Sequence, residues 1–91
     1  MSRETKLNLL SAAMDLKRVA VGYQNDSPEM AERFRKEALR WLKTIPTHEL
    51  PDYLARAVKR LPRQLATGDQ ADQAETALTY SVIIQNYATA N

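Results

Sequence analysis

The side chains that could do chemistry are few in this sequence, and none of them falls into a catalytic or metal-binding pattern. There is no cysteine and a single histidine, His48, which precedes Glu49 in the segment PTHELP. A metal site or a general base at His48 would need a second histidine, a cysteine or a correctly spaced carboxylate, and no H-E-x-x-H or E-x-x-H motif is present. We therefore expect His48 to be a capping or surface residue beside a helix start.

Other catalytic signatures are also missing from the chain. Its two glycines, Gly22 and Gly68, cannot form a phosphate-binding loop or a dinucleotide fingerprint, and no serine lies in a nucleophile motif. Several acidic residues stand near expected helix starts, where they suit the helix dipole better than general acid–base catalysis. The sequence therefore predicts a protein that is not an enzyme and that has no cofactor and no metal site.

The best candidate for a binding surface is the segment ARAVKRLPRQLATGD, residues 55–69. On a helix its basic residues occupy one side, within roughly 100° of one another. They are Arg56, Lys59, Arg60 and Arg63. No carboxylate lies between Asp52 and Asp69 to pair with them. Such a face could bind nucleic acid, an acidic protein or an anionic lipid surface, although most charged helix faces are only solvated.

A second basic row is predicted to be a solvated helix face. It comprises Arg33, Lys36, Arg40 and Lys43. Glutamates precede these residues at the spacing of intrahelical salt bridges, which predicts the pairs Glu29–Arg33, Glu32–Lys36 and Glu37–Arg40. The apolar stripe on the other side of this segment includes Trp41, which we expect to anchor the core.

Four helices must position these residues. The sequence predicts one all-α domain over residues 1–91, a compact bundle with helices at about 2–21, 28–44, 51–66 and 69–88. We expect Gly22 and Gly68 to terminate helices, because glycine enters the left-handed region without steric cost. Ser27 before Pro28 is typical of a helix start, and Asp69 can cap the last helix.

The third helix contains a proline, yet its apolar residues keep one phase across it. Leu54, Val58, Leu61 and Leu65 lie within roughly 60° of one another on a single helix. This agreement favours one helix kinked at Pro62, with a break at Leu61 as the alternative.

The first and last helices have apolar residues on more than one side. In the first helix, Leu7, Leu10, Met14 and Val21 lie opposite Leu9, Leu16 and Ala20, which predicts neighbours on two sides. The last helix has no charged residue from Thr76 onward, so it is either central in the monomer or packed against a second subunit. Its candidates for self-association are Tyr80, Ile83, Ile84 and Tyr87.

These patterns predict a small, non-enzymatic helical module for protein–protein interaction, regulatory or adaptor in character, that self-associates as a possible homodimer. The alternative is a nucleic-acid-binding protein that uses the basic face of the third helix. A helix-turn-helix drawn from the second and third helices would lack the usual turn glycine and would hold Pro62 in its recognition helix. No membrane span or signal peptide is expected, and the absence of cysteine fits a cytoplasmic protein.

Overall fold

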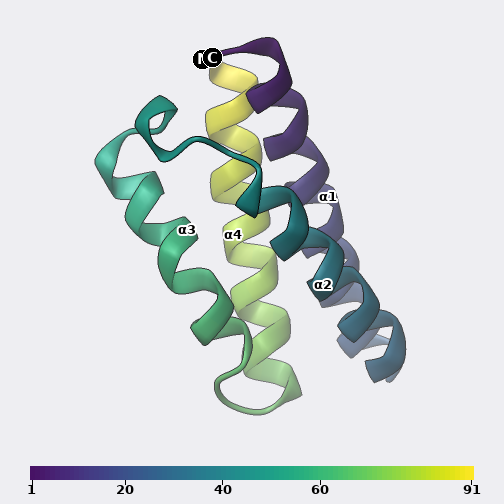
Figure 1. Cartoon of the computed structure of the whole chain (residues 1–91). Helices are drawn as coiled ribbons and strands as arrows, with labels where there is room; N and C mark the ends of the chain where they lie inside the picture. Colours follow the sequence, from purple (N-terminus) through teal and green to yellow (C-terminus); the bar gives the residue numbers. More distant parts are fainter.

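The computed structural model describes all 91 residues and contains helices but no strands (Figure 1). Along the chain come α1 (Arg3–Gln24), α2 (Pro28–Lys43), the short 3₁₀ helix η1 (Thr47–Glu49), α3 (Asp52–Leu65) and α4 (Gln70–Ala90). They form a bundle of 36 × 20 × 19 Å. The all-α, four-helix fold class predicted from the sequence is confirmed, and only η1 was not anticipated.

Local capping chemistry explains where the helices begin. The Ser2 hydroxyl accepts a hydrogen bond from the Thr5 N–H at 3.1 Å and starts α1. Pro28 occupies the first turn of α2, where its missing N–H costs nothing. Asp69 and Asp72 exchange side-chain-to-backbone hydrogen bonds of 2.9 and 3.2 Å, a capping box that starts α4.

Gly22 does not terminate the first helix, contrary to the prediction. The helix α1 continues to Gln24, and the left-handed residue that follows it is Asp26, with φ 54°. Gly22 is needed for a different reason, since an added Cβ would lie 2.8 Å from the backbone nitrogen of Ala31 in α2. Its missing side chain allows α1 and α2 to approach closely. Gly68, with φ 84°, does occupy the left-handed region after α3, as expected.

The third helix runs without interruption through Pro62, from Asp52 to Leu65. The apolar residues on either side of the proline share one buried face, with Leu54 and Leu61 fully buried and Leu65 almost so. The alternative of a break at Leu61 is therefore wrong. Proline removes one backbone hydrogen bond from the helix. Burial of the leucine face on both sides of Pro62 offsets the free-energy cost of that loss.

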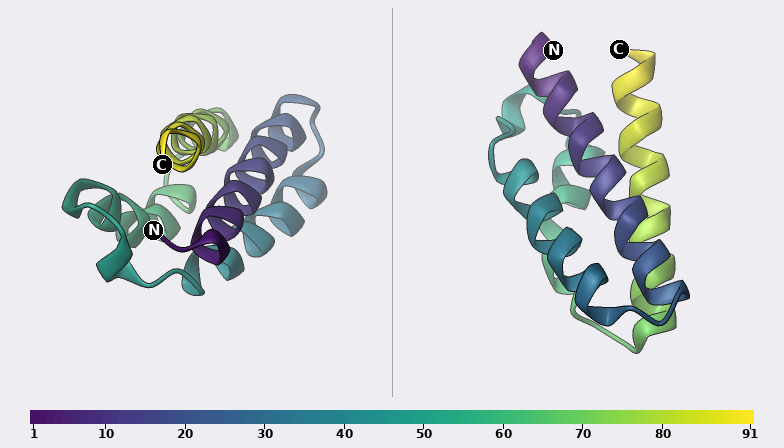
Figure 2. Two further views of the ribbon diagram at one scale, coloured as in Figure 1. Left: turned by 90° about the horizontal axis from the view of Figure 1, so that it is seen from above. Right: turned by 90° about the vertical axis from the view of Figure 1, so that its right-hand side faces the viewer.

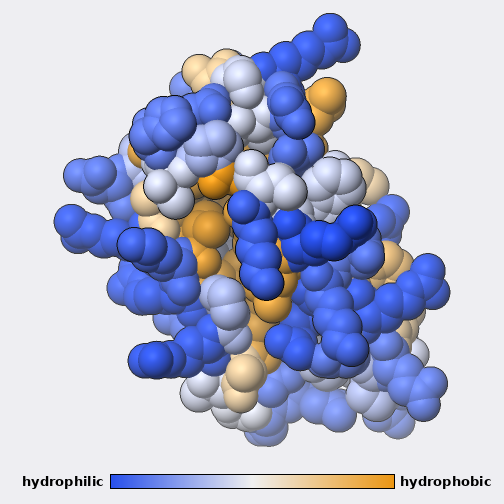
Figure 3. All heavy atoms as spheres, in the orientation of Figure 1, coloured by the Kyte–Doolittle hydropathy of each residue, from blue (hydrophilic) through white to orange (hydrophobic).

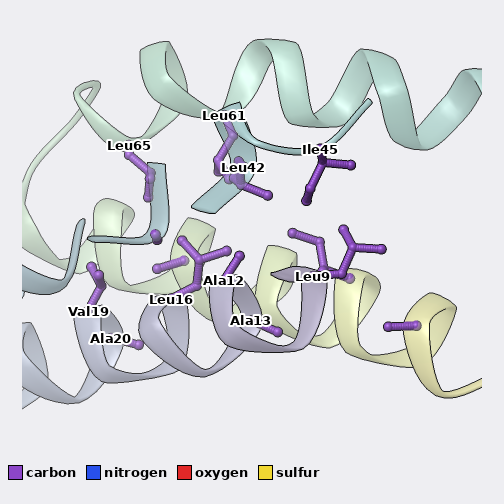
Figure 4. Packing of buried hydrophobic residues seen from close by; sticks show 14 of the residues in the cluster. Leu9, Ala12, Ala13, Leu16, Val19, Ala20, Leu42, Ile45, Leu61 and Leu65 are labelled. Carbon is purple, nitrogen blue, oxygen red and sulfur yellow. The ribbon is translucent and has the colours of Figure 1, made fainter. Parts of the chain in front are cut away.

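The helices pack unevenly. The two views in Figure 2 show α1 between α2 and α4, and it packs extensively against both, whereas α3 packs mainly against α4 and hardly touches α2. One core joins all four helices (Figure 4), where Leu9 and Leu16 of α1 approach Leu42, Leu61 and Leu65. Small residues such as Ala13 and Ala20 on α1 and Ala77 on α4 are buried, which keeps these helices close together.

The helices α1 and α4 each leave one side uncovered by the rest of the chain. Both neighbours of α1 lie toward its Leu9–Leu16 side, so Leu7, Met14 and Val21 stay 53, 56 and 37% exposed. Likewise α4 is not central in the monomer, because it packs against α1 and α3 and leaves Leu78 and Val82 exposed. The two neighbours expected for α1 are therefore α2 and α4, but the side of α1 that carries Leu7 and Met14 is left uncovered by both.

Candidate functional site

The basic side chains predicted on the third helix all reach solvent. Arg56, Lys59, Arg60 and Arg63, here called the α3 basic face, are exposed. The chain forms three ion pairs, all within α1 or α2, so none of the four takes part in one. Arg63 lines a hollow with the carboxylates Asp72 and Glu75 of α4, whereas no such carboxylates surround the other three, which remain available to an anionic partner.

The basic row of α2 is partly neutralised, but not by all of the predicted pairs. Glu37 binds Arg40 at 2.6 Å, as expected. Glu32 binds Arg35 rather than Lys36, through two hydrogen bonds of 2.6 and 2.8 Å, because the forked guanidinium engages both carboxylate oxygens. These bonds to Arg35 lower the pKa of Glu32.

Two arginines of the α2 row lie over aromatic rings. Arg33 makes no ion pair with Glu29 and instead lies over the Phe34 ring, at 5.4 Å from its centroid. Arg40 lies 5.5 Å from the ring centroid of Trp41, which is half-buried against the core. Arg33 also lines a hollow shared with Asp15 and Arg18 of α1, so this end of the row faces away from α3.

The two basic rows meet at a groove between α2 and α3. Its apolar residues come from the end of α2, from the turn that follows it and from α3, namely Leu39, Leu42, Ile45, Val58 and Pro62. Thr47, Lys43 and Lys59 complete its lining. The groove has a volume of about 380 Å³. Figure 3 shows apolar atoms along this depression with hydrophilic side chains on both sides. We call it the α2–α3 groove; the sequence alone did not reveal it.

The residues predicted for self-association on α4 are dispersed by the structure. Ile84 is fully buried in the core, which corrects its place among the candidates, because a partner cannot reach it in the folded chain. The Tyr80 hydroxyl donates to the side-chain carbonyl of Gln64 on α3, and Tyr87 is half-buried against the core. Of the four, only Ile83 is exposed, and 37% of it is accessible.

A different apolar surface is open on the outside of α1 and α4. Six of the eight large hydrophobic side chains that stay exposed belong to these two helices. Met14 and Val21 line a shallow hollow together with Gln85 of α4. Leu78, Val82 and Gln85 follow one another at helical spacing, so they share a side of α4 that Ile83 does not. We call Leu7, Met14, Val21, Leu78 and Val82 the α1–α4 face.

Its signal was visible in the sequence as the side shared by Leu7, Met14 and Val21, which lie seven residues apart. That spacing is typical of a helix that packs along another helix. What the sequence did not provide was the partner, since the same spacing serves a helix packed inside the monomer.

The predicted surface histidine lies in η1, where His48 is exposed. Its neighbour Glu49 accepts hydrogen bonds from the Ser2 N–H at 2.8 Å and the Thr5 hydroxyl at 3.1 Å. The bond from the Ser2 backbone is the main cause that lowers the pKa of Glu49. Glu49 thus ties η1 to the start of α1, where the helix dipole favours an anion.

No group of three or more His, Cys, Asp or Glu side chains is placed to hold a metal ion. None of the helices combines the length and the apolar character needed to cross a bilayer. Comparison of the chain with protein-family models, with curated proteins and with solved structures finds no match.

Proposed function

We propose that the protein is a non-enzymatic interaction module that self-associates through the α1–α4 face. The observation that carries this proposal is the concentration of exposed apolar side chains on two adjacent helices. A water-soluble monomer exposes single hydrophobic residues freely, but several on two packed helices are typical of an interface, here with Lys17 and Arg18 beside Met14 and Val21. The absence of cysteine suits a reducing compartment such as the cytoplasm.

A two-fold dimer is the assembly that this face fits best. The helices α1 and α4 run antiparallel, as the right-hand view of Figure 2 shows, so a second copy turned by 180° presents an equivalent pair. In such an isologous contact the same residues meet on both sides. Met14 and Val82 of each copy would then lie within a four-helix layer.

The molar mass of the protein in solution shows directly whether it forms this dimer. Light scattering or sedimentation should give a dimer at protein concentrations up to about 1 mM, where even a Kd near 1 mM populates the assembly. Met14→Glu and Val82→Glu place charges on the α1–α4 face and should yield monomers. Tyr53→Glu is the matched control, because Tyr53 is 59% exposed on α3 and Met14 is 56% exposed on the face.

Two outcomes would contradict this proposal. A wild-type protein that remains monomeric over this concentration range would refute self-association. Equal dissociation by Tyr53→Glu and Met14→Glu would show that the dimer uses another surface. Circular dichroism of each variant checks that the helices are retained, as expected because all three substituted positions lie outside the core.

A further inference from the structure

The α2–α3 groove is a place in the bundle that no helix fills. Three of the helices form a close layer, because α1 packs against both α2 and α4. The remaining helix, α3, lies against α4 but diverges from α2. Leu39 and Val58 consequently remain partly exposed on the two walls, and Pro62 is exposed. A further helix laid between α2 and α3 would bury these side chains.

The charges around the groove are of one sign. Lys43 on α2 and Lys59 on α3 both line it, and neither makes an ion pair. The rest of the α3 basic face follows on the same helix, and α3 has no carboxylate after Asp52. An occupant that carries Asp or Glu beside an apolar stripe would therefore match the groove both in polarity and in charge.

We propose that the α2–α3 groove binds an acidic amphipathic helix of a partner protein. The walls are helices with no free strand edge, so an added β-strand has nothing to pair with, whereas helix-in-groove docking needs only apolar anchors at positions i, i+3 or i+4, and i+7. The lining residues of α3 run from Val58 to Pro62, which is roughly 6 Å of helix, so the groove holds the anchors of one to two turns of a longer partner helix.

Nucleic acid is a poorer match to the same cations. A phosphate backbone would satisfy Lys43 and Lys59, but it has no aliphatic stripe to cover Leu39, Val58 and Pro62. A second copy of this chain is the other possible occupant. The groove lies on α2 and α3, away from the α1–α4 face, so this proposal does not depend on the proposed dimer.

Designed peptides test the groove. The probe is a fluorescein-labelled peptide of about 16 residues with leucines at helical spacing and glutamates on both flanks. One control peptide carries lysine in place of every glutamate, and a second keeps the acidic composition in a scrambled order without a leucine stripe. Fluorescence anisotropy at low salt should show binding of the probe and of neither control, and labelled-protein NMR should place the shifts at Leu39 and Val58.

Matched charge reversals test the two lysines that line the α2–α3 groove. The double variant Lys43→Glu/Lys59→Glu should weaken binding of the probe by roughly tenfold or more, because two attractions become repulsions. Arg3→Glu/Lys6→Glu makes the same change in net charge at the start of α1 and should leave the affinity near that of the wild type. All four substituted residues are outside the core, so the fold should be retained in both variants.

Several results would overturn the proposal. Absence of probe binding at about 100 µM protein, or equal binding of the scrambled acidic peptide, would show that the groove does not accept an amphipathic helix. Displacement of the probe by random duplex DNA or by single-stranded RNA at lower concentration than by unlabelled peptide would assign the surface to nucleic acid. A change in solution mass caused by the Lys43/Lys59 reversals, but not by Met14→Glu, would assign the groove to a second copy.

Discussion

Gly22→Ala tests the close approach of α1 and α2. A Cβ built on Gly22 would lie 2.8 Å from the backbone nitrogen of Ala31 and 3.0 Å from its Cα atom. Because these are backbone atoms, no rotation of a side chain can relieve the contact. The helix α2 must move away from α1, and the movement loosens the packing that surrounds Ala31, which is fully buried.

Two effects of opposite sign set the size of the change. Overpacking a core position costs about 1–3 kcal/mol. Alanine is favoured over glycine inside a helix by up to ~1 kcal/mol, and this gain is reduced at Gly22, which is only two residues from the end of α1. We therefore expect Gly22→Ala to lower the free energy of unfolding by about 1–2 kcal/mol. For a domain of this size the melting temperature should fall by about 5–15 °C.

Urea and thermal unfolding followed by circular dichroism measure this loss. Lys17→Ala on the exposed side of α1 is the control, and it should remain within about 0.5 kcal/mol of the wild type. If Gly22→Ala were as stable as the wild type or more stable, the helix preference of alanine would outweigh the clash. The interpretation of Gly22 as a spacer between α1 and α2 would then be refuted.

Three further substitutions test other parts of the structure. Leu61→Ala removes a fully buried side chain and should cost about 2–5 kcal/mol in urea unfolding, whereas an unchanged midpoint would contradict its burial. Asp69→Ala removes the cap of α4 and should cost about 1 kcal/mol in thermal melts; a wild-type melting temperature would show that the capping box is dispensable. Glu49→Gln should flatten the loss of stability in acid. Because hydrogen bonding to Ser2 and Thr5 lowers the pKa of Glu49, its contribution is complete above the ordinary glutamate pKa and is lost as the pH falls through the lowered value. Melts between about pH 7 and pH 3 measure this slope, and equal slopes for the variant and the wild type would contradict the role of Glu49.

The helix starts could be predicted because their causes are local. Ser2, Pro28 and Asp69 act on backbone groups within the next few residues, so the sequence around each position is sufficient. The continuity of α3 was also predictable, since the phase of its leucines across Pro62 is a property of one segment. Gly22 was misinterpreted because its role depends on Ala31, a residue of the next helix.

The sequence predicted the candidate surfaces only in part, because which side chains stay exposed depends on how the helices pack against one another. Exposure of the α3 basic face followed from one amphipathic helix. Ile84 was misplaced because the last helix is apolar over most of its circumference, and the sequence does not show which side meets α1 and α3. The α2–α3 groove depends on the divergence of two helices, which is set by packing among residues far apart in the chain.

The uneven packing of α3 has a consequence for motion. A helix held mainly by one neighbour has fewer contacts to lose when it detaches, so its local opening should require less free energy than the opening of α1. This same helix carries one wall of the groove and the basic face. An occupant of the groove would add a neighbour on the side of α3 that diverges from α2. Its affinity would then include the cost of holding α3 in place, and substitutions that loosen α3 against α4 would weaken binding without touching the partner.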